Sequence, residues 1–243
     1  MSTFTFNTTP SVRMGVGLAQ KLGDIAGPVC GENILFVTDP GMVATGLVEK
    51  AVSVLVGAGL KVTVFDKVQA DPPEAIIQSA VEMARAASGV VGFGGGSSLD
   101  VAKLAALLAA SGQPLEDAFG IGNATGPRLP LVLVPTTSGT GSEVTPISIV
   151  TTGTSEKMGV VSPLILPDVA VLDPELTLGL PAHVTAATGI DAMVHAIEAY
   201  ASTNPNNNPI SRALAVEALR LMGRVLKRAV DTPADIEARS DMM

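Results

Sequence analysis

The sequence predicts an α/β fold, with an amino-terminal parallel-sheet domain over residues 1–180 and an all-helical domain from residue 181 onward. Three observations predict it. Between residues 32 and 110, short β-branched runs alternate with longer segments of helical periodicity. From residue 128, strand-like segments follow one another closely, and beyond Pro181 only helical periodicity remains. Alternating strands and helices build a parallel sheet that is covered by helices on both faces.

The first strands are predicted at residues 34–37, 62–65 and 90–93, where β-branched and aromatic side chains cluster. Apolar residues at helical spacing over 47–56 and 76–84 predict the helices between them. In folds of this class ligands bind beyond the carboxyl ends of the strands. The loops that directly follow strands are therefore the expected positions of a functional site.

Further strands are predicted at residues 131–134, 147–150 and 169–172. Two amphipathic helices are predicted at 182–201 and 210–230, with a turn rich in asparagine and proline between them.

The last ten residues are good helix formers, and Thr232 and Pro233 are predicted to be the cap and the first-turn proline of their helix. No glycine or other stop signal follows. The sequence is therefore expected to end inside a helix, either as a frayed natural terminus or as a truncated chain.

Composition limits the classes of partner. The 243 residues carry 15 Lys and Arg against 23 Asp and Glu, a net charge of −8, and basic residues are not concentrated anywhere. This pattern argues against nucleic acid and anionic membranes as partners. No segment reaches the length of a membrane span and no secretion signal is recognised, so we expect a cytoplasmic protein. The single cysteine, Cys30, fits a reducing compartment and is expected to be a small buried hydrophobe.

A glycine-rich turn follows the third predicted strand and precedes a helix that begins near Leu99. The turn consists of Gly94, Gly95, Gly96, Ser97 and Ser98. Glycines let the backbone approach a ligand closely, and the N–H groups of the helix start, together with the two serine hydroxyls, suit a phosphate or pyrophosphate. A tight structural turn is the alternative.

Asp39 lies just past the first predicted strand and before the glycine turn. This order is the reverse of the usual dinucleotide fingerprint, in which the glycine turn comes first. A carboxylate at a strand end accepts from a ribose 2′-hydroxyl and repels a 2′-phosphate, which favours NAD over NADP. Since Asp39, Pro40 and Gly41 are also good turn formers, a turn or cap role stays open.

Two further groups of polar residues have candidate roles. The segment 135–145 follows a strand and is rich in hydroxyls that suit nucleotide sugars, phosphates or polarised carbonyls, although an ordinary polar loop fits as well.

Asp191 and His195 project from one helix face, as two ligands of a divalent metal would; an intrahelical hydrogen bond or a capped core histidine is the alternative. Glu198 either orients His195 or faces solvent, and His183 is expected to be solvated or to cap the helix.

Taken together, these residues resemble the iron-containing (group III, metal-dependent) alcohol dehydrogenases. The matching motifs occur in the family's order along the whole chain, at residues 38–42, 94–103, 135–145, 166–168 and 189–200.

The resemblance implies an amino-terminal Rossmann-like dinucleotide-binding domain followed by an all-helical, metal-binding domain, with NAD and a divalent metal (Fe preferred, Zn possible) between them. The implied cofactor residues are Asp39 at the adenosine ribose, Gly96 and Ser97 at the pyrophosphate, Thr136, Thr140 and Thr145 at the nicotinamide side, and Gly95, Asp100, Thr137, Lys157 and Leu172 as further contacts. The implied metal ligands are Asp191 and His195, two of the family's four.

The family's two other ligands are histidines further downstream, so the resemblance implies an amino-terminal fragment whose helical domain, 181–243, is incomplete. The implied reaction is reversible hydride transfer between a small alcohol and NAD, in which the metal polarises the alcohol or carbonyl oxygen and no other catalytic side chain is needed. The alternatives are a relative of maleylacetate reductase or glycerol dehydrogenase, or a catalytically inactive NAD-binding chain. The implied partners are a small alcohol or aldehyde and, at full length, further copies of the chain.

Overall fold

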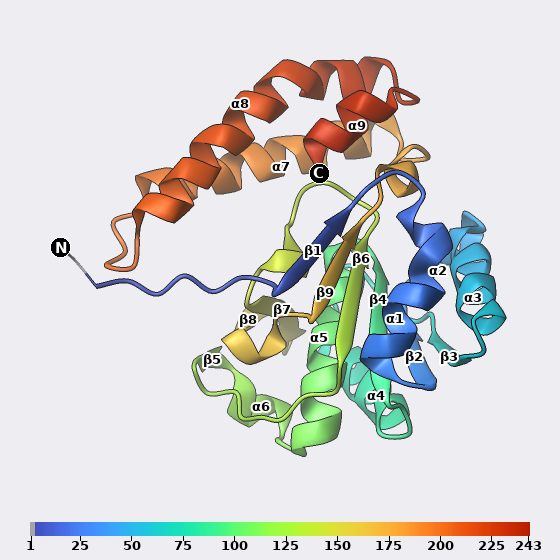
Figure 1. Cartoon of the computed structure of the whole chain (residues 1–243). Coiled ribbons are helices and arrows are strands. Elements are labelled where there is room, and N and C mark those ends of the chain that lie inside the picture. Colours follow the sequence, from blue (N-terminus) through green and yellow to red (C-terminus); the bar gives the residue numbers. More distant parts are fainter. Residues whose placement is uncertain (1–2) are drawn as a thin grey trace. The chain divides into compact units, whose positions relative to one another are not determined.

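The computed structural model describes residues 3–243 (Figure 1). The chain divides into two compact units. The α/β unit comprises residues 8–136 and 142–173, and the helical unit comprises the described residues up to Asn7 together with 137–141 and 174–243. The predicted α/β fold, with a parallel sheet and a helical part, is confirmed. The predicted domain boundary at residue 180 stays a prediction.

A six-stranded sheet forms the centre of the α/β unit, in the order β1-β9-β6-β4-β2-β3, and every pairing within it is parallel. Its strands are β1 (Ser11–Met14), β2 (Asn33–Val37), β3 (Lys61–Phe65), β4 (Gly89–Gly94), β6 (Leu131–Pro135) and β9 (Val169–Leu172). Five of these were predicted. The edge strand β1 was not, because it is short and mostly exposed and therefore has no buried apolar run.

Helices cover both faces of this sheet. On one face α1 (Leu22–Cys30) packs against α3 (Leu47–Gly57), and on the other α4 (Glu74–Ala84) packs against α5 (Gly96–Ser111) (Figure 1). Strand–helix–strand crossovers are right-handed, and the crossovers after β2 and after β4 run toward opposite edges of the sheet, so α3 and α5 must lie on opposite faces. A short helix, α2 (Pro40–Ala44), follows β2 directly.

The core of the α/β unit is aliphatic. Every residue of β4 and of β6 is buried, as expected for strands that are covered on both faces. The rings of Phe36 and Phe93 pack with their centroids 5.5 Å apart. Cys30 is buried as predicted, and burial raises the pKa of its thiol to about 12.

A smaller three-stranded sheet, in the order β5-β8-β7, completes the α/β unit. Its strands are β5 (Gly120–Ile121), β7 (Ile147–Thr152) and β8 (Glu156–Val161), of which β7 and β8 form an antiparallel hairpin. The strand expected at 147–150 is therefore present, but it lies outside the main sheet. Short connecting elements are α6 (Leu115–Ala118) and the 3-10 helices η1 (Leu18–Lys21), η2 (Ser142–Val144) and η3 (Pro163–Ile165).

The helical unit contains η4 (Pro174–Thr177), α7 (Ala182–Ala201), α8 (Pro209–Asp231) and α9 (Ile236–Met242). The two long helices were predicted. The cap of α9 was predicted wrongly: Asp235, not Thr232, accepts from the N–H of Ala238, because the chain first makes a turn in which the N–H of Asp235 bonds to the carbonyl of Thr232. In the described part of the chain no helix combines the length and apolar character of a membrane span.

Candidate functional site

The carboxyl ends of the parallel strands meet at one edge of the main sheet, and the direction of the crossovers changes between β2 and β4. From β2 the chain passes through α3 to β3, whereas from β4 it passes through α5 toward β6 on the other side. Loops that diverge at such a point leave room for a ligand between them. Asp39 follows β2 and the glycine turn follows β4, so both predicted cofactor groups lie at this switch point.

Hydrogen bonds from two sides fix the carboxylate of Asp39. Its Oδ1 accepts from the N–H of Met42 at 3.0 Å, which makes Asp39 the N-cap of α2, and its Oδ2 accepts from the Ser98 hydroxyl at 3.0 Å. Asp39 is only half-buried, so the carboxylate stays accessible to a ligand. The expectation that the Ser98 hydroxyl faces a phosphate is wrong, because Ser98 is buried and donates to Asp39 instead.

The glycine turn opens helix α5. Gly95 is its N-cap residue, and no side chain accepts a hydrogen bond from the first N–H groups of the helix. Gly95, Gly96 and Ser97 are half-buried and thus reachable. A 16-residue helix whose N–H groups point into an accessible loop favours a negatively charged ligand, so the turn can hold a phosphate or pyrophosphate.

Lys103 lies two turns further along α5 and is fully buried. Its ammonium group donates to the carbonyl oxygens of Thr145 at 2.9 Å and Ile147 at 2.8 Å. Desolvation lowers the pKa of Lys103 to about 8, and the nearby charges of Asp100 and Glu143 offset part of that effect. Lys103 thereby anchors the chain on both sides of residue 146, including the predicted cofactor residue Thr145.

Asp100 anchors the same segment at two other points. Its carboxylate accepts from the hydroxyl of Ser142 at 2.5 Å and from the N–H of Ile149 at 2.9 Å, and it lies 3.8 Å from the Nζ of Lys103. Burial raises the pKa of Asp100 against the opposing effect of these partners. Since these groups engage both carboxylate oxygens, Asp100 positions the segment 142–149; a direct contact between Asp100 and a cofactor stays a prediction.

Three other predicted cofactor residues of the α/β unit differ in their position on the strands, in burial and in their contacts. Thr136 directly follows β6, is buried, and its hydroxyl lies 3.4 Å from the sulfur of Met42. Leu172 ends β9 and is buried. Lys157 lies on β8 of the smaller sheet, not at a strand end, and forms an ion pair with Asp71, whose φ of 53° is positive.

Thr137 and Thr140 belong to the helical unit, where their loop packs against α7. A Cβ atom placed on Gly139 would lie 2.8 Å from the Cβ and 2.9 Å from the carbonyl oxygen of Thr188. Only glycine allows this approach. Thr188 is one helical turn before Asp191, so the loop packs on the side of α7 from which Asp191 projects. The helical unit thus brings predicted cofactor residues near predicted metal ligands.

Asp191 and His195 lie on successive turns of α7, with Oδ1 of Asp191 and Nε2 of His195 3.7 Å apart. The distance is too long for an intrahelical hydrogen bond, and the His195 side chain is 53% exposed, so neither alternative from the sequence describes the pair. Both Glu198 and His183 are exposed. The carboxylate and imidazole fit two positions of a divalent metal site. Within residues 3–243, no third His, Cys, Asp or Glu joins them.

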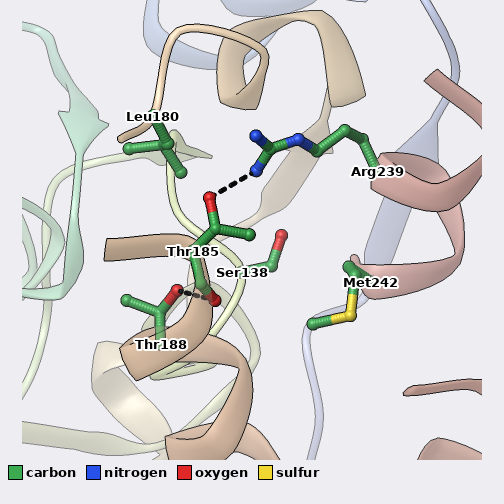
Figure 2. Close-up of a pocket in the computed structure, with 6 residues that line it drawn as sticks. All are labelled: Ser138, Leu180, Thr185, Thr188, Arg239 and Met242. Atoms are coloured by element: carbon green, nitrogen blue, oxygen red, sulfur yellow. Dashed lines mark hydrogen bonds between the residues drawn. The ribbon is translucent and has the colours of Figure 1, made fainter. Parts of the chain in front are cut away.

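A small pocket in the helical unit surrounds a buried arginine (Figure 2). Arg239 is 2% exposed and donates to the Thr185 hydroxyl at 2.8 Å and to the carbonyl oxygen of Pro233 at 3.1 Å. Sequence reasoning missed Arg239. Its signal was a charged residue within the apolar face of α9, between the buried Ala238 and Met242.

Comparisons with known proteins found matches along most of the chain. A family model described as "Iron-containing alcohol dehydrogenase" matches residues 9–174, and one described as "Fe-containing alcohol dehydrogenase family, C-terminal" matches residues 185–243. The long-chain-alcohol dehydrogenase 1 of Geobacillus thermodenitrificans is 44% identical over 241 residues, which cover 96% of this chain and 60% of that protein. The NAD-dependent methanol dehydrogenase of Bacillus methanolicus is 37% identical, with coverage of 98% and 62%.

Solved structures show the same relationship. The sulfoacetaldehyde reductase of Bifidobacterium kashiwanohense in complex with NAD+ superposes with a TM-score of 0.90 at 33% identity, covering 99% of this chain and 64% of that one. An alcohol dehydrogenase from Oenococcus oeni gives a TM-score of 0.93 at 31% identity, covering 99% and 63%. The chain spans about 60% of the length of the two curated relatives. The family models together match most of its length, and the chain belongs to the iron-containing alcohol dehydrogenase family.

Proposed function

We propose that this chain provides the NAD site and two metal ligands of a metal-dependent alcohol dehydrogenase. The observation that carries the proposal is the switch point of the parallel sheet, where the fixed carboxylate of Asp39 and the open start of α5 follow the adjacent strands β2 and β4. We include a two-domain organisation with a boundary near residue 180 in this proposal.

Each group at the switch point has a definite task. Asp39 accepts hydrogen bonds from the adenosine ribose, and the N–H groups of Gly96 and Ser97 bind the pyrophosphate. Gly95 lets the backbone approach the ligand. Thr136 and Thr145 bind the nicotinamide side through their hydroxyl groups, with Thr145 held in place by Lys103.

Thr140 is proposed for the nicotinamide side as well. The remaining proposed cofactor contacts are Asp100, Thr137, Lys157 and Leu172. Lys157 already pairs with Asp71, so its contact with a cofactor requires the ammonium to leave or to share that carboxylate.

Asp191 and His195 would hold a divalent metal, which when bound supplies a Lewis acid at the alcohol or carbonyl oxygen. The family makes iron our first choice and zinc the second. Two protein ligands are fewer than the three or four usual in tight divalent sites, so the residues in this chain alone bind the metal weakly.

The substrate class that we propose is a small primary alcohol and its aldehyde. Methanol and 4-hydroxybutyrate, which name two of the relatives, are primary alcohols, and sulfoacetaldehyde, which names a third, is an aldehyde. This shared chemistry supports a hydride transfer at a terminal carbon. At the full length of the relatives, we propose a homo-oligomer.

The proposal is tested on two proteins: this chain and the same chain extended with the carboxyl-terminal part of the Geobacillus thermodenitrificans relative. NAD binding is measured by calorimetry, and NADH formation is followed by absorbance with a panel of primary alcohols and ferrous or zinc ions. We expect both proteins to bind NAD and the extended one to oxidise alcohols. Asp191→Ala should abolish oxidation and leave NAD binding intact. Failure of both proteins to bind NAD would contradict the proposal.

A further inference from the structure

The contact between Ser98 and Asp39 joins two loops that are distant in sequence. Ser98 lies in the first turn of α5, after β4, and Asp39 follows β2, 59 positions earlier. Ser98 is 1% exposed, so its hydroxyl is shielded from solvent. The hydroxyl donates its hydrogen bond to the carboxylate.

Gly94 makes this contact possible. Its φ of 148° lies in the region that favours glycine. A Cβ atom on Gly94 would lie 2.8 Å from the Ser98 hydroxyl and 3.1 Å from Oδ2 of Asp39, and would push the two groups apart. The glycine turn thus has a second role besides admitting a phosphate, because it leaves space for the serine to reach the carboxylate.

Both oxygens of Asp39 are therefore held before any ligand arrives. Oδ1 is held by the N–H of Met42 and Oδ2 by Ser98, each at 3.0 Å. Each carboxylate oxygen has a further lone pair, so both can still accept from ribose hydroxyls. A carboxylate fixed in this way cannot rotate away from a 2′-phosphate, whereas one held only at Oδ1 can turn about its side-chain bonds and relieve the repulsion.

We propose that Ser98 is a positioning residue that determines the preference for NAD over NADP by holding the Asp39 carboxylate in place. This inference rests on the proposed function, since it requires that Asp39 face the adenosine ribose. Ser98 itself touches no cofactor. Its loss should weaken NAD binding only slightly, because the carboxylate remains, and should strengthen NADP binding, because the carboxylate can then move aside.

The test is the ratio of the dissociation constants of NADP and NAD, measured by calorimetry on the same preparation of the 243-residue chain. For Ser98→Ala we expect this ratio to fall about fivefold, mainly through tighter NADP binding, a size consistent with partial relief of a like-charge contact. Ser98→Cys keeps the side-chain shape, with a somewhat larger volume, and donates only weakly, so its ratio should lie in between.

Ser88→Ala is the matched control. The Ser88 hydroxyl also donates within this sheet, to the carbonyls of Cys30 and Asn33, but at the opposite end of β2 and β4. A general loss of stability would affect both cofactors alike in Ser88→Ala and Ser98→Ala. Only a role at Asp39 changes the ratio, so the control should match the wild type.

Asp39→Gly tests the proposed orientation of the cofactor separately from the role of Ser98. If Asp39→Gly leaves the ratio unchanged, Asp39 does not face the ribose, and the cofactor orientation in the proposed function is wrong. If Asp39→Gly lowers the ratio while Ser98→Ala does not, the positioning role of Ser98 is overturned and the proposed function stands. In the Asp39→Gly background, adding Ser98→Ala should cause no further change; a further fall would also overturn the inference.

Discussion

Replacing Lys103 by methionine tests the buried charges that anchor the segment 142–149. Methionine has a similar length and no charge, so the substitution removes the donor to the carbonyl oxygens of Thr145 and Ile147 and leaves Asp100 without its cation. Removing one partner of a buried ion pair typically costs about 3–5 kcal/mol. We expect the free energy of unfolding of Lys103→Met to fall by about that amount.

The difference in stability between the wild type and Lys103→Met should also depend on pH. Because burial lowers the pKa of Lys103 from 10.5 to about 8, the unfolded chain binds a proton between these values that the folded chain does not. The stability that this group contributes is therefore complete above the pKa of the unfolded chain, 10.5. It is lost as the pH falls toward the pKa of the folded chain, about 8. Between pH 8 and 10.5, wild-type stability should rise relative to Lys103→Met, by at most about 3 kcal/mol.

Urea unfolding followed by circular dichroism at a series of pH values measures both effects. Lys50→Met, at an exposed position of α3, controls for the loss of a lysine charge and should stay within about 0.5 kcal/mol of the wild type. Asp100→Asn combined with Lys103→Met should cost less than the sum of the two single changes, because the pair is coupled. A Lys103→Met protein as stable as the Lys50→Met control, with no difference in pH dependence, would refute the anchoring role.

Three further predictions concern other parts of the chain. Burial raises the pKa of Asp168, but the hydrogen bonds from Arg128 and from a main-chain N–H outweigh this effect and hold the pKa below its ordinary value of 3.8. The resulting stabilisation is lost as the pH falls through the pKa of the folded chain. In urea titrations, acid should therefore destabilise the wild type more steeply than Asp168→Asn. Cys30, with its pKa raised to about 12, should resist a thiol reagent at pH 8 until the chain unfolds; rapid labelling of the folded protein would contradict its burial. Gly139→Ala should lower the melting temperature because its Cβ meets the backbone of α7, whereas Gly179→Ala, in open space, should not.

The main sheet could be predicted from sequence because its central strands are covered on both faces. β2, β4 and β6 therefore form nearly continuous apolar runs, and α3 and α4 show regular amphipathic spacing. β1 and β8 were not predicted because three of the four residues of β1 and three of the six residues of β8 are exposed, so neither strand forms a buried apolar run. Their pairing depends on neighbours far along the chain, which local patterns do not contain.

The sequence predicted which residues form the candidate site, but not the hydrogen bonds between them. Asp39 and the glycine turn were recognisable because loops after strands meet at one sheet edge. Ser98 donates to Asp39, and Lys103 anchors Thr145. Both contacts depend on which strands are neighbours and on the burial of each side chain. A lysine and a serine in a helix that is otherwise largely apolar do not reveal their partners by themselves.

A structure of this chain from crystals grown with NAD would show whether the cofactor binds at the switch point between β2 and β4. We expect the pyrophosphate within hydrogen-bond distance of the N–H groups of Gly96 and Ser97, and the adenosine ribose hydroxyls on the carboxylate of Asp39. Cofactor bound elsewhere on the chain, or a glycine turn without cofactor at saturating NAD, would contradict this expectation.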